Sequence, residues 1–382
     1  MLTVANIWRI IAPKKEHDMQ GELQHLKRVS RIKHKILTRY LPSWATILGS
    51  AFDKLYYIDC FAGPGKYESE GKPVDGSPII AVKAGKEFAT KNPGKNLGVV
   101  LVDDDDEQMN QLGTCLKSTH PYPPNLVVQT RMANSRGLIP GIVAQIKKRQ
   151  SAASFFLVDP YGHPLSIPVM NDILALPRSE LLINLMWYRI NMDMENPAVQ
   201  HRVTELFGDE SWKAQPFASQ HGAQRERGFF NFFRARLSAQ YVRWFRIQYD
   251  AQEDKVGGTR TKYYLIHASN SLKAVLLMKE VMWPLGDEEG TFDFSGSSQG
   301  VLISQTPQPG ELRDILLREF SGQQMAFDDI RGKTWNLPFI EKHYRSVLQE
   351  LRSSGAVEVM SVSTKGKGLA KRDLVRFPKE GS

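Results

Sequence analysis

Residues 55–65 read LYYIDCFAGPG, a short apolar and aromatic run that ends in a turn with two glycines. A continuous apolar run of this length is typical of a strand buried on both faces of a parallel sheet. Gly63 and Gly65 permit a tight turn in which backbone approaches a ligand, because neither has a Cβ atom. The stretch therefore predicts the first strand of an α/β domain. It is weaker evidence for a ligand site, because many α/β proteins use such a turn for packing alone.

Further apolar runs alternate with helical patterns along the chain. Strands are expected at 97–103, 125–130, 154–162, 180–186 and 262–269, and helices at 77–89, 106–118, 138–150, 166–177 and 271–283. This alternation predicts an α/β fold with a doubly wound, mostly parallel sheet. Residues 187–258 interrupt it and are expected to be a helical insertion. Its last part, at 225–249, has an aromatic stripe at helical spacing and predicts a helix whose aromatic face is core.

Ligands of such sheets bind at the carboxyl ends of the strands, so the residues that follow each strand are the informative ones. Asp103 ends the second strand and suits the two hydroxyls of a ribose, since one carboxylate can accept both hydrogen bonds. Asp104 to Asp106 follow it and can instead cap the next helix. The dinucleotide fingerprint is not met, because Glu68 stands where its third glycine would be. Asp59 beside the glycine turn suits a cation, which favours S-adenosylmethionine, with its sulfonium, over NAD.

Asp159, Pro160 and Tyr161 follow the fourth strand. A carboxylate followed by an aromatic ring can accept a hydrogen bond from an exocyclic amine and stack on a base that has left its helix. The same residues also make an ordinary turn at the end of a strand. Together with the two upstream loops, the triplet favours the functional interpretation, and no metal is expected to be needed.

The whole combination resembles the three-Cys-motif partner (TcmP) family of bacterial proteins, which are class I methyltransferase-like. The resemblance covers about residues 8–296 and rests on KHKILTRYLPSWATIL (33–48), YYIDCFAGPGKY (56–67), DGSPIIAV (75–82), FFLVDPYGHPLS (155–166), SELLINLM (179–186), YYLIHASN (263–270) and FDFS (292–295). It implies a Rossmann-like fold that binds S-adenosylmethionine, and a radical-SAM-type partner that carries the three cysteines.

Carried over residue by residue, the resemblance assigns cofactor binding to Asp59, Phe61, Ala62, Gly63, Gly65 and Asp103, and catalysis to Asp159, Pro160 and Tyr161. Ser77 and Asn184 are secondary pocket candidates, which can equally be ordinary loop polar residues. Methyltransferases that act on base amino groups usually have two prolines in the catalytic loop. This chain has one, so its aromatic residue comes one position early.

Composition narrows the class of protein. The 382 residues include 50 Lys and Arg against 41 Asp and Glu, and only two cysteines, Cys60 and Cys115. Two cysteines exclude a disulfide scaffold or a four-cysteine metal site within one chain, and they favour a reducing, cytoplasmic location. Neither a signal peptide nor a membrane span is expected. The positive excess is concentrated in residues 1–50, with nine basic against three acidic residues, around an amphipathic helix in HLKRVSRIKHKILTRYLPSW (25–44). Its basic face is either simply solvated or in contact with phosphates.

Residues 309–382 follow a linker and predict three helices, at 311–320, 327–335 and 338–355, then a hairpin. This order is that of a winged helix, which the TcmP family also has at this end. The expected groove readers are Lys342, His343 and Arg345, with Lys365, Lys367, Lys371 and Arg372 of the wing on phosphates. The alternative is a winged helix that docks a protein. The expected division is therefore a methyltransferase domain at 1–303, with a basic N-terminal helix within 1–50, and a winged helix at 309–382.

Two functions remain open from the sequence. One is an S-adenosylmethionine-dependent methyltransferase that acts on nucleic acid, DNA or RNA, at an amino group of a base. The other is a non-catalytic nucleic-acid-binding subunit that delivers substrate to the radical-SAM-type protein, for example in phage defence.

Overall fold

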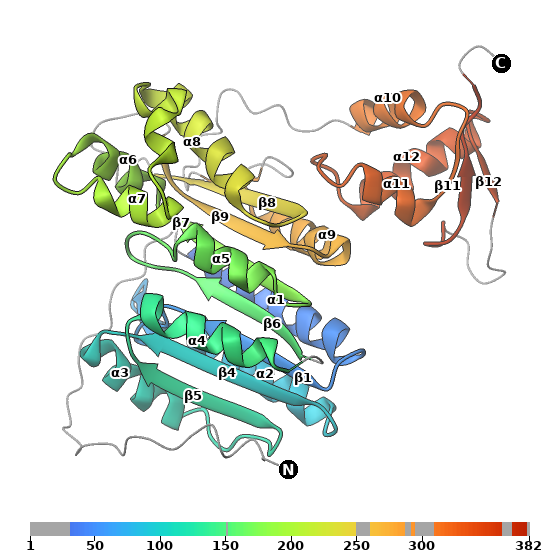
Figure 1. The fold of residues 1–382 in the computed structure, drawn as a ribbon. Coiled ribbons are helices and arrows are strands. Elements are labelled where there is room, and N and C mark those ends of the chain that lie inside the picture. The colour runs from blue at the N-terminus through green and yellow to red at the C-terminus, as the bar shows by residue number, and fades with distance from the viewer. Residues whose placement is uncertain are drawn as a thin grey trace.

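The computed structural model describes residues 31–149, 152–249, 260–286, 292–294, 309–360 and 369–379. Their centre is an eight-stranded sheet (Figure 1). In spatial order its strands are β10 (Asp293–Phe294), β8 (Tyr241–Gln248), β9 (Thr261–Ser269), β7 (Ser179–Leu185), β6 (Ala152–Val158), β1 (Lys54–Asp59), β4 (Asn96–Asp103) and β5 (Leu126–Met132).

The strands from β5 to β7 run parallel, and β9 alone runs against its neighbours β7 and β8. Every residue of β6, β7 and β9 is buried, as the continuous apolar runs predict. The chain order reverses at β1, with β4 on one side and β6 on the other. The prediction of a Rossmann-like, doubly wound and mostly parallel α/β sheet is confirmed.

Helices cover both faces of the sheet, and alternate residues of one strand point to different layers. In β6, Phe155 and Leu157 belong to one apolar core, while Phe156 and Val158 belong to the other. The first core is shared with α1 (Arg31–Gly49), α2 (Ser77–Lys91), α3 (Asp106–Lys117) and α9 (Leu272–Met282). The second is shared with α4 (Ser135–Lys147), α5 (Ile167–Leu174), α6 (Trp187–Glu195), α7 (His201–Phe207) and α8 (Gly222–Arg236).

The prediction of one helix over 225–249 is wrong in its second half. Helix α8 ends at Arg236, and 241–248 form strand β8. Phe245 and Ile247 face one core while Val242 and Trp244 face the other, which is the two-residue period of a strand. Because these residues are apolar on both sides, their spacing also satisfies a helical template. Pairing with β9 decides for the strand, so the insertion ends by contributing to the sheet.

The basic N-terminal helix is only partly within the described residues. Its described part, α1, buries Ile32, Ile36, Leu37 and Tyr40 against the sheet, as the spacing predicts. Its other apolar positions, Leu26 and Val29, and its bases Lys27 and Arg28 lie at 1–30, outside the described residues. Among the described residues, no helix combines the length and the apolarity needed to cross a bilayer.

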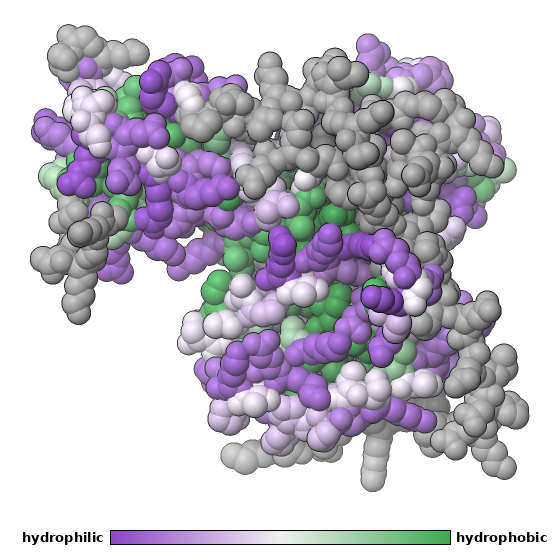
Figure 2. Space-filling model, turned by 180° about the vertical axis from the view of Figure 1, so that it is seen from behind, coloured by the Kyte–Doolittle hydropathy of each residue, from purple (hydrophilic) through white to green (hydrophobic). Residues whose placement is uncertain are grey.

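The C-terminal residues fold around a separate core. Three helices, α10 (Pro309–Glu319), α11 (Phe327–Lys333) and α12 (Glu341–Ser353), pack on an antiparallel sheet with the order β11-β13-β12. The strands are β11 (Gln324–Ala326), β12 (Glu358–Met360) and β13 (Leu374–Arg376). Figure 2 shows this unit at the upper left with a mainly hydrophilic surface, because its apolar side chains are inside. Lys365 and Lys367 lie outside the described residues.

This unit is attached to the sheet domain through the start of its helix α12. The His343 ring lies 4.5 Å from that of Trp283, and the Lys342 ammonium is 5.8 Å from the same ring. The buried Lys279 of α9 donates hydrogen bonds to the backbone oxygens of Trp335 (3.0 Å) and Leu337 (3.1 Å). His343 is therefore engaged by the sheet domain, which argues against its interpretation as a groove reader in this arrangement. Lys342 is exposed, and its interpretation stays a prediction.

The third predicted reader, Arg345, is also engaged within the chain. It bonds the carboxylate of Glu341 at 2.6 Å and the backbone oxygen of Leu369. A guanidinium held in this way is not extended toward a base edge.

Candidate functional site

The candidate site lies at the edge of the sheet where the parallel strands end. Asp59 ends β1 and Asp103 ends β4, while Asp159 directly follows β6 and Asn184 lies near the end of β7. In Figure 1 this edge is at the left, on the side of α3 and α6, and the C-terminal unit is at the right, where β8 begins. The sequence therefore correctly predicts that these loops meet at one edge.

The glycine turn after β1 is built by backbone geometry. Gly63 and Gly65 have φ values of +66° and +85°, in the left-handed region that favours glycine. The amide of Gly63 donates to Asp103 Oδ2 (2.8 Å), and the amide of Asp105 donates to Asp103 Oδ1 (3.0 Å). Asp103 thus fastens the turn to the end of β4. Each carboxylate oxygen keeps a further lone pair for a ligand.

Asp59 is fully buried beside this turn. It accepts hydrogen bonds from the Phe61 amide (3.3 Å) and from the Tyr57 hydroxyl (3.2 Å). Burial is the main cause that raises the pKa of Asp59 to about 7; the charge of Asp159 adds to it, and the hydrogen bond from Ser77 opposes it. A cation placed here would restore the charged form of Asp59.

Asp159 has both of its carboxylate oxygens engaged within the chain. The Lys33 ammonium of α1 pairs with Oδ2, and Asn184 Nδ2 donates to Oδ1 at 2.7 Å. The side chains of Lys33 and Asp159 are only 13% and 11% exposed, so this pair is screened little by water. Sequence reasoning placed Lys33 on a solvated or phosphate-binding face, and it missed this contact. A possible sequence signal is that Lys33 lies between the apolar positions Ile32 and Ile36, which face the core.

The side chain of Tyr67 packs over the glycine turn. It belongs to the hairpin of β2 (Lys66–Ser69) and β3 (Lys72–Asp75). A Cβ atom at Gly63 would lie 2.7 Å from its hydroxyl oxygen. Burial raises the pKa of Tyr67, and the nearby charges of Asp159, Asp59 and Asp103 raise it further. Tyr67 is therefore near all three carboxylates and was not among the predicted site residues.

His34 is the second buried ring at this place. It packs 5.8 Å from the Tyr67 ring, and its Nδ1 has no hydrogen-bond partner among the described residues. Burial, and then the charge of Lys33, lower the pKa of His34 to about 3. The imidazole is therefore neutral at physiological pH.

The remaining predicted residues have different environments. Ala62 and Pro160 are buried and Phe61 is half-buried, but Tyr161 is 90% exposed. Asp105 caps α3 by accepting from the Gln108 amide (2.9 Å). The capping interpretation thus holds for Asp105.

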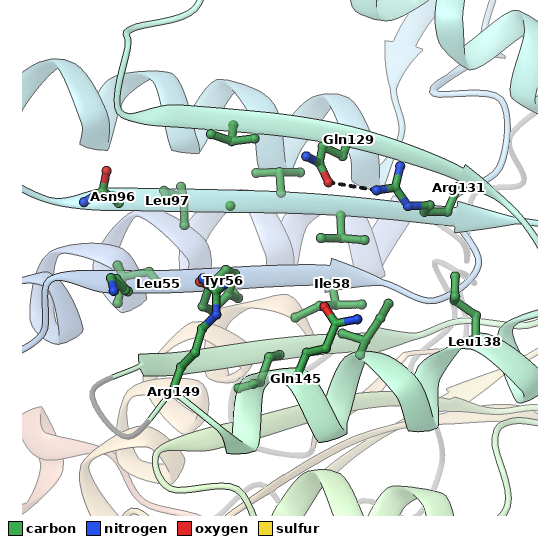
Figure 3. A pocket seen from close by; sticks show the side chains of 17 residues that line it. Leu55, Tyr56, Ile58, Asn96, Leu97, Gln129, Arg131, Leu138, Gln145 and Arg149 are labelled. Carbon is green, nitrogen blue, oxygen red and sulfur yellow. Dashed lines mark hydrogen bonds between the residues drawn. The ribbon is translucent and has the colours of Figure 1, made fainter. Parts of the chain in front are cut away.

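A separate apolar cavity of about 200 Å³ lies between α4 and strands β1, β4 and β5 (Figure 3). Its polar groups contact one another: Arg149 donates to the Tyr56 hydroxyl (2.6 Å), and Arg131 donates to Gln129 Oε1 (3.3 Å). The described residues that line it include no Asp, Glu, His, Cys or Ser. The acid–base groups are instead at the carboxyl edge, where we place the candidate site.

No family model and no curated protein matches the chain. Among solved structures, it is similar to a Legionella pneumophila protein of family model DUF519, with 13% identity, 66% of this chain and 86% of that chain covered, and a TM-score of 0.38. A SAM-dependent methyltransferase from Agrobacterium tumefaciens has 10% identity, 60% and 61% covered, and a TM-score of 0.32. A DNMT2 mutant from Spodoptera frugiperda has 11% identity, 78% and 83% covered, and a TM-score of 0.26. Likenesses this distant carry no argument about chemistry.

Proposed function

We propose that this protein is an S-adenosylmethionine-dependent methyltransferase that acts on an amino group of a nucleic-acid base. The observation that carries the proposal is the convergence at one sheet edge of Asp59, the glycine turn and Asp103 with the pair Asp159–Asn184. The first group suits a cationic nucleoside, and the second offers oxygen acceptors for an amine. We further propose membership of the TcmP family, a winged helix at the C-terminus, and a cytoplasmic location.

The residues present fit the cofactor. Asp59 has a raised pKa and lies beside a turn that only glycine allows, so it suits the positive charge of the ligand. Asp103 keeps lone pairs for ribose hydroxyls. When bound, S-adenosylmethionine would supply an activated methyl group.

The acceptor side would be formed by Asp159 and Asn184. Among the described residues, Asn184 Oδ1 is buried and has no hydrogen-bond partner. A buried carbonyl oxygen without a donor is costly, and an amine N–H would satisfy it. Asp159 is held by Lys33 in this structure, so an incoming amine would take the place of the ammonium.

The second candidate function is a non-catalytic nucleic-acid-binding subunit that serves a radical-SAM-type three-Cys-motif protein, for example in phage defence. One observation favours it: both oxygens of Asp159 already have partners within the chain.

Calorimetric titration with S-adenosylmethionine tests the cofactor, with two glycine variants as a matched pair. Gly63→Ala and Gly71→Ala each add a Cβ atom to a residue in the left-handed region, with φ values of +66° and +74°. A Cβ at Gly63 would meet the Tyr67 hydroxyl, whereas a Cβ at Gly71 would meet open space. We expect binding to the wild type and to Gly71→Ala, with weaker binding to Gly63→Ala. Absence of binding to the wild type would refute the cofactor.

Transfer of labelled methyl groups to DNA and RNA then separates the two functions. The enzyme requires transfer that is lost in Asp159→Ala while calorimetric binding persists. Cofactor binding without transfer to any nucleic acid would favour the non-catalytic subunit.

A further inference from the structure

Large apolar side chains are exposed around the candidate site. Among the described residues six such side chains are exposed, and four of them lie at the ends of parallel strands or in the segments that follow. They are Met132 at the end of β5 (62%), Tyr161 after β6 (90%), and Tyr188 (41%) and Met192 (44%) on α6 after β7. Tyr161, Tyr188 and Met192 follow the neighbouring strands β6 and β7, whereas Met132 is three strands away from β6. Exposed apolar side chains on neighbouring elements favour an interaction site beside β6 and β7.

Basic groups lie beside these aromatic rings. Tyr188 packs edge-on against Tyr249 at 5.5 Å, and the Arg260 guanidinium is 5.7 Å from the Tyr249 ring. The Lys262 ammonium is 5.2 Å from the same ring. Strand β8 runs in the direction of β7, so Tyr249, the residue after its end, and Arg260 are at the same edge as Tyr161. Arg189 adds an exposed guanidinium next to Tyr188.

Rings combined with guanidinium groups suit nucleic acid whose bases are not paired. Aromatic side chains stack on base faces, which are accessible only when the bases leave the duplex stack. One common way to read a duplex is to place a helix in the major groove. The start of α12 is less suited to this, because His343 packs on Trp283.

We propose that the aromatic and basic edge formed by Tyr161, Tyr188, Tyr249, Arg189 and Arg260 binds single-stranded nucleic acid. The inference rests on the proposed function, because it supplies the substrate class for that same site. The rings hold bases by stacking, and the arginines pair with phosphates. Tyr161 is two residues after Asp159, so a base that stacks on Tyr161 would be close to the candidate catalytic carboxylate.

The test is fluorescence anisotropy of the full chain with labelled oligonucleotides of about 20 nucleotides, a length that covers one or two typical binding sites. Single-stranded DNA, RNA of the same sequence and duplex DNA form the three arms. We expect each single strand to bind more tightly than the duplex. The single strand that binds more tightly shows whether the protein prefers RNA or DNA. Equal or tighter binding of duplex, or no binding to any oligonucleotide, would overturn the inference.

Variants assign the binding to this edge. Tyr188→Ala should weaken single-strand binding about 5- to 150-fold, which corresponds to the stacking of one base. Tyr188→Phe keeps the ring and should bind like the wild type, as should Ile47→Ala, which removes an exposed apolar side chain from α1. Arg260→Gln should make the plot of log affinity against log salt shallower by about 0.7, the value for one phosphate contact on a single strand. Unchanged binding in Tyr188→Ala would contradict the inference.

The two proposals can fail separately. Cofactor binding by calorimetry with no oligonucleotide binding removes the surface inference and leaves the cofactor in place. Single-strand binding that depends on Tyr188 without any cofactor binding keeps this surface and removes the methyltransferase.

Discussion

The ion pair between Lys33 and Asp159 joins α1 to the loop after β6, and it should contribute strongly to stability. Removing one partner of a buried pair leaves an uncompensated charge, which costs about 3–5 kcal/mol. With side chains 13% and 11% exposed, this pair belongs to that class rather than to surface pairs. We therefore expect Lys33→Met to lower the free energy of unfolding at pH 8 by about 3–5 kcal/mol. Lys35→Met is the matched control, because Lys35 is exposed on the same helix and should change stability by less than about 0.5 kcal/mol.

The measurement is urea unfolding followed by far-UV circular dichroism and tryptophan fluorescence, whose curves must coincide for the free energy to be well defined. Asp159→Asn, made alone and in the Lys33→Met background, completes a double-mutant cycle, because the neutral amide no longer needs the ammonium. We expect a coupling energy of about 2 kcal/mol or more between the two positions. Equal stability of Lys33→Met and Lys35→Met, or additive effects in the cycle, would refute the reasoning.

Three further predictions concern charge and packing. Because the pKa of Asp59 is about 7, its carboxylate becomes protonated below pH 7, and cofactor affinity should fall by about tenfold per pH unit there. Asp59→Asn should not show this fall. Equal affinity of the wild type at pH 5.5 and pH 8 would contradict the prediction. Burial lowers the pKa of Lys279 from 10.5 to about 7, so between these values the unfolded chain binds more protons and stability rises with pH. Lys279→Met should abolish that rise of stability in urea titrations at pH 7, 8 and 9. An unchanged rise would show that another group causes it. Phe155 is completely buried between Tyr40 and Tyr57, so Phe155→Ala should cost about 3–5 kcal/mol in the same unfolding assay, and a loss below 1 kcal/mol would show that this core repacks.

The sheet itself could be predicted from sequence because its information is local. The runs around Tyr57, Val99 and Phe156 are apolar over their whole length, as burial on both faces requires. The residues after each strand then follow from topology, which places Asp59, Asp103 and Asp159 at one edge. That part of the candidate site needed no coordinates.

Strand β8 and the start of α12 could not be predicted in the same way. Tyr241, Trp244 and Phe245 satisfy helical and strand spacing equally, and only pairing with β9 decides between them. Lys342 and His343 have the charge and position of groove readers, but the ring of His343 packs on Trp283 of another unit. Whether a side chain is free depends on packing that the local pattern does not contain.

The sequence alone therefore determined the fold class and the set of acidic residues at the strand ends, because the two-residue and 3.6-residue periods encode which faces are buried. Tertiary structure decided what those residues meet. Lys33 pairs with Asp159 across 126 positions of the chain, and Tyr67 reaches three carboxylates from a hairpin of its own. Such contacts depend on strand order and on how helix α1 lies across the sheet. Electrostatic partners are chosen by distance in space, and the sequence records only distance along the chain.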